Sequence, residues 1–308
     1  MKIKDIGEIK LIERISKGIK LDASVVKGIG DDTAIIAWPG RAAARGKYLL
    51  YTCDMLVEDV HFTRAQATPF QIGWKAMARN LSDIAAMGGV GRYAVVSIGM
   101  DPGDNLSFVD GIYKGIKAAC GKFKVNIVGG DISKSGKTVI DISLIGEVEK
   151  KKLVTRSGAK EGDLILVTGS FGGSIKRKHL NFIPRIAEAR QLVNNFKINS
   201  MIDVTDGLVL DLSRILEASH VGARINQNLI PVSGDAVSFG RAITDGEDFE
   251  LLFTMSVDEA RRFFRTLFAK MKTPVTLIGE VTGKRDGLIL VTDDAKEKKI
   301  KPKGYLHF

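Results

Sequence analysis

Apolar residues in the first half of the chain recur at helical spacing, and the repeats predict three helices. Near the start, isoleucines stand three or four positions apart, which predicts a helix over about residues 7–18. A second helix is predicted from Pro69 to the Gly88–Gly89 pair, because proline favours the first helical position and glycine follows the last turn. A third is predicted over 105–123. Short apolar runs lie between these helices and predict strands.

The strands are expected in an irregular order. In the first half they are predicted after Asp32 and over 48–53, 93–99, 125–128 and 139–146, with 125–128 expected to be buried. The second half predicts a strand over 164–168, a helix over 184–196, a strand closed by Asp203, a helix with Thr205 as a possible cap, and a final strand, helix, strand and strand. Because helices and strands do not alternate regularly, we expect an α/β protein with α+β-type mixed sheets.

The length and composition are compatible with two domains. A chain of 308 residues can form two ordinary cores, and the run Lys150–Lys152 indicates a linker or a hairpin. We therefore predict domains over 1–149 and 150–308. No apolar run has the length of a membrane span, and the first residues lack a signal-peptide core. With only two cysteines in apolar surroundings, a disulfide framework is not expected, and the prediction is a reduced, cytoplasmic protein.

The net charge of +10 raises the question of nucleic-acid binding. The lysines and arginines are scattered, and their short clusters lack the interleaved aromatic residues of single-strand binding proteins. A solvated basic surface that suits an anionic small substrate is the preferred interpretation, and no nucleic-acid partner is expected.

Acidic residues gather in turns and at the predicted ends of strands. Asp31 and Asp32 follow a glycine turn, Asp54 ends an apolar run, Asp131 follows two glycines, and Asn80 and Asp83 share one side of a helix. Further acids of this kind are Asp203, Asp206 and Glu247. Each can be an ordinary cap or turn residue. Together, and without a Cys/His cluster, they favour Mg²⁺ and ATP-dependent phosphoryl transfer.

Several other motifs have the wrong context. Gly136-Lys137-Thr138 resembles the end of a P-loop, but the preceding glycine is misplaced and a strand follows where a helix is required. Gly89-Val90-Gly91 precedes a strand and follows a helix, which is the reverse of a dinucleotide-binding turn. No nucleophile elbow with a histidine partner is present, and the four histidines lack zinc-ligand spacing.

Nearly the whole chain resembles one family in motif order. The segments are GIGDDTAII, TCDMLVEDVHF, WKAMARNLSDIAAMGG, VGGD, TRSGAKEGDLILVTG, IDVTDGLVLDL, GEDFELLFT and KGYLHF. They resemble thiamine-monophosphate kinase, of the superfamily that includes aminoimidazole ribonucleotide synthetase. The resemblance implies a two-domain architecture, an N-terminal sheet that pairs with its copy in a homodimer, and ATP bound near that interface. It also implies the Mg²⁺-assisted conversion of ATP and thiamine monophosphate to ADP and thiamine diphosphate.

The resemblance also implies roles for particular residues. Nucleotide contacts would be Gly130, Asp131, Arg156 and Thr205, and substrate contacts would be His61, Glu247 and Tyr305. Metal-site positions would be Asp32, Thr52, Cys53, Asp54, Asp83, Asp131, Asp203 and Asp206. No general base is assigned, because the oxygen of a phosphate monoester is already anionic at neutral pH.

Some positions depart from the family pattern. Cys53 stands where Ser or Thr is usual, which favours a backbone oxygen ligand there, and Asp245 replaces a glycine beside the substrate acid. The region after Ser174 is short. One alternative is therefore a sister enzyme with another acceptor, although a selenophosphate-type enzyme should have an earlier cysteine and a hydrogenase-maturation type a cysteine tail. The D-G-E-D-F-E-L-L segment fits aminoimidazole ribonucleotide synthetase less well. The other alternative is a non-catalytic nucleotide-binding or regulatory protein, which loss of the acids would favour.

Overall fold

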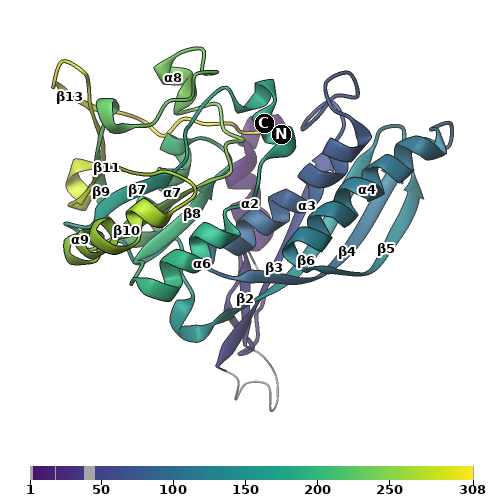
Figure 1. The fold of residues 1–308 in the computed structure, drawn as a ribbon, viewed down its shortest axis with the longest axis horizontal. Coiled ribbons are helices and arrows are strands. Elements are labelled where there is room, and N and C mark those ends of the chain that lie inside the picture. Colours follow the sequence, from purple (N-terminus) through teal and green to yellow (C-terminus); the bar gives the residue numbers. More distant parts are fainter. Residues whose placement is uncertain (1–2, 18, 38–45, 308) are drawn as a thin grey trace.

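The computed structural model describes residues 3–17, 19–37 and 46–307. It contains two mixed sheets, one from each half of the chain (Figure 1). The elements of the first half are α1 (Ile3–Ile6), α2 (Glu8–Ser16), β1 (Val25–Lys27), β2 (Ala34–Ala37), β3 (Lys47–Val57), α3 (Pro69–Ala86), β4 (Val90–Met100), α4 (Leu106–Phe123), β5 (Asn126–Lys134) and β6 (Val139–Glu149). The predicted fold class is therefore confirmed.

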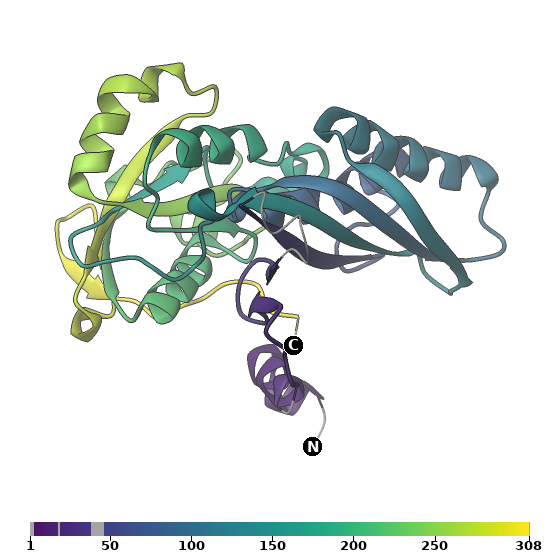
Figure 2. The same ribbon diagram turned by 90° about the horizontal axis from the view of Figure 1, so that it is seen from below.

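The first sheet has the strand order β1-β2-β3-β6-β4-β5, with only β4 and β5 paired in parallel. Helices α3 and α4 cover one side of it (Figure 2). The two helices pack very closely, since a Cβ atom at Gly73 would lie 1.8 Å from the Ile112 carbonyl oxygen and one at Gly115 would lie 2.0 Å from that of Phe70. Glycine at these positions therefore sets how closely α4 can approach α3.

The second half forms a sheet in the order β13-β12-β9-β11-β7-β10-β8. Helix α7 packs in the hydrophobic core on one face of this sheet, and α6 and α9 pack in the core on its other face. The elements are β7 (Leu164–Thr168), α5 (Lys178–Asn181), α6 (Ile186–Asn195), β8 (Ser200–Val204), α7 (Leu208–Ser219), β9 (Gly222–Asn226), α8 (Phe239–Ala242), β10 (Glu250–Met255), α9 (Val257–Thr266), β11 (Val275–Thr282), β12 (Leu288–Val291) and β13 (Glu297–Lys299). No described helix is both long and apolar enough to cross a membrane.

Helix α3 lies where the two halves meet and contacts both β3 and β8. Its start is fixed by a capping box, in which the Thr68 hydroxyl accepts from the Gln71 N–H and the Gln71 side chain accepts from the Thr68 N–H. This confirms the start predicted from Pro69. Because α3 is anchored against both sheets, side chains on its two flanks can join residues that are far apart in sequence.

Four local predictions were wrong. The segment 125–128 is not a buried strand, because β5 is the edge strand of its sheet and is mostly exposed. Asp54 and Asp131 lie inside β3 and β5 rather than at strand ends. Thr205 does not cap α7, whose N-cap is Gly207.

Strands β1, β9 and β13 were not predicted. The other predicted strands and helices are present within a few residues, apart from the predicted end of the first helix at Gly18, which lies outside the described residues. The domain boundary between 149 and 150 falls at the end of β6 and stays a prediction.

Candidate active site

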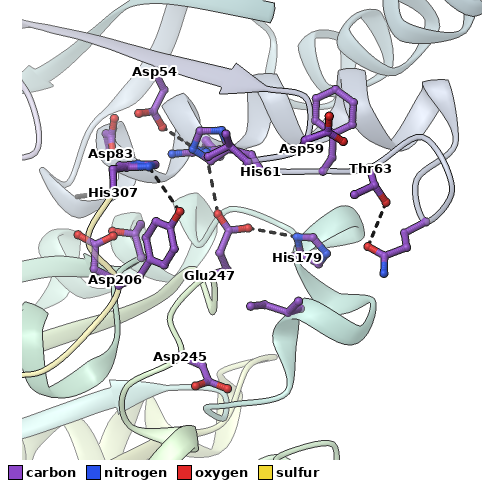
Figure 3. Close-up of a pocket in the computed structure, with 17 residues that line it drawn as sticks. Asp54, Asp59, His61, Thr63, Asp83, His179, Asp206, Asp245, Glu247 and His307 are labelled. Carbon is purple, nitrogen blue, oxygen red and sulfur yellow. Dashed lines mark hydrogen bonds and ion pairs between the residues drawn. The ribbon is translucent and has the colours of Figure 1, made fainter. Parts of the chain in front are cut away.

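A cavity of about 210 Å³ lies between the two halves of the chain. Its wall combines residues from β3, α3, the loop after β8, the turn before β10 and the C-terminal segment (Figure 3). The predicted site residues that line it are Asp54, His61, Asp83, Thr205, Asp206, Glu247 and Tyr305. The structure therefore brings predicted metal ligands and predicted substrate contacts into one pocket.

Helix α3 supplies polar contacts to both halves. The Asn80 side chain accepts from the Asp54 N–H at 3.1 Å, and the Thr52 hydroxyl donates to Asp83 at 2.6 Å. Ser82, one position earlier, donates to Asp203 of β8 at 2.5 Å. Helix α3 is thus the element that holds the acids of β3 and β8 close together.

Burial raises the pKa of Asp83 and of Asp203 well above the usual range for a carboxyl group. Neighbouring carboxylates add to the rise: Asp54 acts on Asp83, and Asp32 acts on Asp203. Asp32 itself has a raised pKa because it is buried, although the charge of Arg156 opposes the rise. These carboxyl groups therefore interact electrostatically and would be stabilised in the charged form by a cation.

One carboxylate oxygen of Asp32 is available to bind a ligand. Its Oδ1 accepts from Arg156 Nη2 at 2.6 Å and Nε at 3.2 Å. Its Oδ2 is buried and has no hydrogen-bond partner among the described residues. Hard oxygen donors of this kind suit Mg²⁺. However, no three Asp, Glu, His or Cys side chains in the described ranges are already arranged to hold a metal ion.

The opposite wall of the pocket is built around Glu247. Its Oε2 contacts the Lys75 ammonium and lies 3.1 Å from His179 Nδ1, and its Oε1 lies 3.9 Å from Arg79 Nη1. Burial alone would raise the pKa of Glu247, but the His179 hydrogen bond and the charges of Lys75 and Arg79 lower it to about 2. Glu247 is therefore an anion at any working pH.

His61 and Tyr305 complete this wall. Burial and the nearby Arg79 and Lys75 charges lower the pKa of His61 to about 3, so its ring is neutral. The Val57 N–H donates to His61 Nδ1 at 3.0 Å, which leaves the proton on Nε2. The Tyr305 N–H donates to the Asp206 carbonyl at 2.8 Å and so fixes the C-terminal segment beside the pocket.

The loop that carries Thr205 and Asp206 is ordered by a residue of α7. The buried Asp211 carboxylate accepts from the N–H groups of Thr205, Asp206 and Gly207 at 3.0, 2.9 and 3.2 Å. Arg214 then pairs with both Asp211 and Asp206. Asp211, in the first turn of α7, therefore satisfies the N–H groups that precede the helix, while Gly207 stands at the N-cap position predicted for Thr205.

Seven predicted site residues do not line this pocket. Thr52 and Asp203 contact α3 beside it, and Asp32 and Arg156 pair with each other, whereas Gly130, Asp131 and Cys53 lie away from it. Gly130 and Asp131 are on the edge strand β5, and Cys53 is exposed and donates to Asp141 at 3.1 Å. Directly opposed residues share a face of a sheet, and the pairs Asp131–Ser97, Ser97–Asp141 and Met55–Asp141 place Asp131 on the same face as Cys53. That is the face opposite Asp54, so one chain does not unite all the predicted ligands.

Sequence reasoning missed three residues that line the pocket, Arg79, His179 and His307, and two that hold its wall in place, Lys75 and Asp211. For Lys75 and Arg79 a signal was present, because two cations stand four positions apart in a helix that otherwise reads as buried. His179 and His307 carry no comparable local pattern, since tertiary packing alone brings them to the pocket.

Comparison with known proteins identifies the family. The AIR synthase related protein N-terminal domain matches residues 30–148, and the corresponding C-terminal domain matches residues 160–291. The thiamine-monophosphate kinase of Rhodopirellula baltica is 39% identical, with 92% of each chain covered. The chain belongs to the thiamine-monophosphate kinase family. The enzyme of Aquifex aeolicus, also in this family, is 32% identical over 100% of both chains.

Solved structures agree with this membership. The structure described as AaThiL complexed with AMPPCP and TMP has a TM-score of 0.84 and 32% identity, and the match covers 100% of this chain and 99% of that one. The hydrogenase maturation protein HypE in complex with ATP has a TM-score of 0.71 at 18% identity and shares the fold alone.

Proposed function

We propose that this chain transfers the γ-phosphate of ATP to thiamine monophosphate and so forms ADP and thiamine diphosphate. The observation that carries the proposal is the single pocket that joins Asp54 and Asp83 to His61, Glu247 and Tyr305. Family membership over nearly the full chain supports it, as does the structural match to a relative complexed with an ATP analogue, AMPPCP, and TMP.

The acids would bind Mg²⁺ together with the nucleotide. The unpartnered Asp32 Oδ2 and the mutually repelling Asp83 and Asp203 fit a divalent cation, and Asp54 and Asp206 line the adjoining pocket. Because no complete ligand set is preformed in the described ranges, phosphate oxygens of ATP would supply the remaining ligands. Bound Mg²⁺ would neutralise polyphosphate charge and align the reacting oxygens.

The other wall would bind the acceptor. Thiamine carries a cationic ring, and Glu247 is a permanent anion on the pocket wall. The neutral His61 offers an Nε2–H donor, and Tyr305 offers an aromatic face. The phosphate oxygen of the acceptor would attack the γ-phosphorus as the bond to the β-phosphate oxygen breaks, and ADP leaves. No residue has to remove a proton from a dianionic phosphate.

A homodimer would account for the residues outside the pocket. On the outer face of the first sheet, Tyr51, Met55, Tyr93 and Val95 are 44%, 53%, 47% and 41% exposed, and Cys53 and Asp131 share that face. An exposed apolar patch is typical of an interaction surface. We propose that a second copy covers it, with ATP reaching Gly130, Asp131 and Arg156 near the interface, and that the protein acts in the cytoplasm.

The test is an assay of purified protein with Mg-ATP and thiamine monophosphate. ADP and thiamine diphosphate should appear in equal amounts, and formation of both should stop when Mg²⁺ is chelated. Release of ADP without thiamine diphosphate would show another acceptor or plain hydrolysis and would reject the proposal.

A further inference from the structure

Arg79 has unused hydrogen-bonding capacity on the wall of the pocket. This residue of α3 has a side chain that is only 14% exposed, and its Nε donates to Asp54 Oδ2 at 3.1 Å. Its Nη1 is buried and has no hydrogen-bond partner within the described part of the chain. A buried donor without a partner is costly, so an oxygen supplied by a ligand would stabilise this arrangement.

Glu247 does not satisfy this donor. Arg79 Nη1 lies 3.9 Å from Glu247 Oε1, which allows electrostatic attraction but is too long for a hydrogen bond. The other oxygen of Glu247 is already held by Lys75 and His179. Lys75 also donates to the His61 carbonyl at 2.8 Å, so its ammonium group is committed to protein partners. Among these cations, Arg79 is the one that retains a free donor.

The position of Arg79 indicates which ligand oxygen it would meet. One side of its guanidinium pairs with Asp54, among the acids proposed to bind the nucleotide and its metal. The other side points towards Glu247, the anion proposed to hold the cationic ring of thiamine. The phosphate of the acceptor has to lie between those two groups, because it joins the thiamine moiety to the reacting γ-phosphorus.

We propose that Arg79 binds the phosphate group of the acceptor and thereby selects a phosphorylated over an unphosphorylated thiamine. This inference rests on the proposed function and adds to it a residue that determines specificity. A planar guanidinium can donate two parallel hydrogen bonds to a phosphate, whereas an ammonium group cannot. Its positive charge would also reduce the repulsion between the acceptor phosphate and the γ-phosphate of ATP.

The test compares two ligands that differ only in the phosphate. Isothermal titration calorimetry would measure the Kd of thiamine monophosphate and of thiamine for the full chain, for Arg79→Gln and for Arg79→Lys, with Mg²⁺ present. The matched control is Arg224→Gln, an exposed arginine of β9 paired with Glu297 at 3.0 Å. Circular dichroism would establish that each variant is folded.

We expect Arg79→Gln to weaken thiamine monophosphate binding about 10- to 100-fold while thiamine binding changes less than about twofold. Arg79→Lys should recover part of the loss, and Arg224→Gln should match the wild-type chain. The inference is overturned if Arg79→Gln leaves the ratio of the two Kd values unchanged, whether it weakens the binding of both ligands equally, of neither, or of AMPPCP alone. If the wild-type chain binds the acceptor and turns it over, such results reject only the role of Arg79. If it does neither, the proposed function itself fails, and this inference with it.

Discussion

The two faces of strand β3 carry different chemistry, although their residues alternate along one short stretch of sequence. Thr52 and Asp54 point towards α3, where Asp83 accepts from the Thr52 hydroxyl and Arg79 donates to the Asp54 carboxylate. Cys53 and Met55 point outward and are exposed. The inner face is covered by α3, which also contacts β8 of the second half, whereas the outer face meets no other part of the described chain that buries it.

The acids of the two faces therefore lie in different surroundings. On the inner side, burial and neighbouring carboxylates raise the pKa of Asp83 and of Asp203. On the outer side, Asp131 is exposed on an edge strand. Asp131 therefore becomes part of a site only when a nucleotide or a partner chain lies against the outer face.

The largest expected effect separates the two faces directly. Asp54→Asn should lower kcat about 100- to 1,000-fold, because it removes a carboxylate proposed to hold the Mg²⁺ that neutralises the reacting phosphates. Met55→Leu, one position further on the outer face, should retain activity within about twofold. ADP release would be measured for both variants with saturating substrates. Comparable losses in the two variants would show that the faces do not differ in function.

The second prediction concerns the buried cation of the inner side. Lys75→Met should lower the free energy of unfolding by about 3 kcal/mol, because it leaves Glu247 and His179 without the ammonium group between them. Lys137→Met, which breaks an exposed pair with Asp59, should cost less than about 1 kcal/mol. Urea unfolding at pH 7 would measure both changes, and similar values would argue against a special role for enclosure.

Much of the fold could be predicted from local pattern. Helix α3 was found because Thr68-Pro69 marks its start and Gly88-Gly89 follows its end. The strand over 164–168 was found because its apolar run lies between turn residues. The burial of strand β5 was predicted wrongly, because an apolar run does not reveal whether a strand lies at the edge or the centre of a sheet.

The site was only partly predictable for a related reason. Asp54 and Glu247 were singled out as acids in turns or at predicted strand ends, Tyr305 was named from the family resemblance, and packing brings all three to one pocket. The alternation of β3 separates Cys53 from Thr52, and a linear motif does not show which residues face the same way. Lys75 was missed, because the residues that bind its buried ammonium group, His179 and Glu247, lie over 100 positions away in the sequence.

The third prediction uses the acid next to Glu247. Burial raises the pKa of Asp248 from its usual 3.8 to about 7, although the charge of Lys178 opposes the rise. The folded state therefore holds the proton more tightly than the unfolded state does. This stabilising contribution is complete below about pH 4 and is lost as the pH rises through 7.

Between pH 5 and pH 7 the wild-type chain should lose about 2 kcal/mol more unfolding free energy than Asp248→Asn. The variant keeps an oxygen that can accept from the Gly172 N–H, which lies 3.0 Å from Asp248 Oδ1. Asp258→Asn, at a side chain that is 92% exposed, should follow the wild-type curve. Parallel curves for all three proteins would contradict the assignment.

The smallest expected effect tests the outer face. Val95 is 41% exposed in the middle of β4, among the apolar side chains proposed to meet a second copy. Val95→Glu should weaken self-association about tenfold or more, because it places an unpaired charge in an apolar contact. Sedimentation velocity over a range of protein concentrations would measure the shift from dimer to monomer.

Val257→Glu, at a side chain that is 38% exposed at the start of α9 in the second half, provides the matched control. If the two variants sediment alike, the outer face is not the dimer interface. If only Val95→Glu dissociates and its nucleotide KM also rises while acceptor binding is retained, the outer face contributes to the ATP site. In that case the two faces of β3 divide the reaction between them, with the acceptor on the enclosed side and part of the donor on the side that a partner covers.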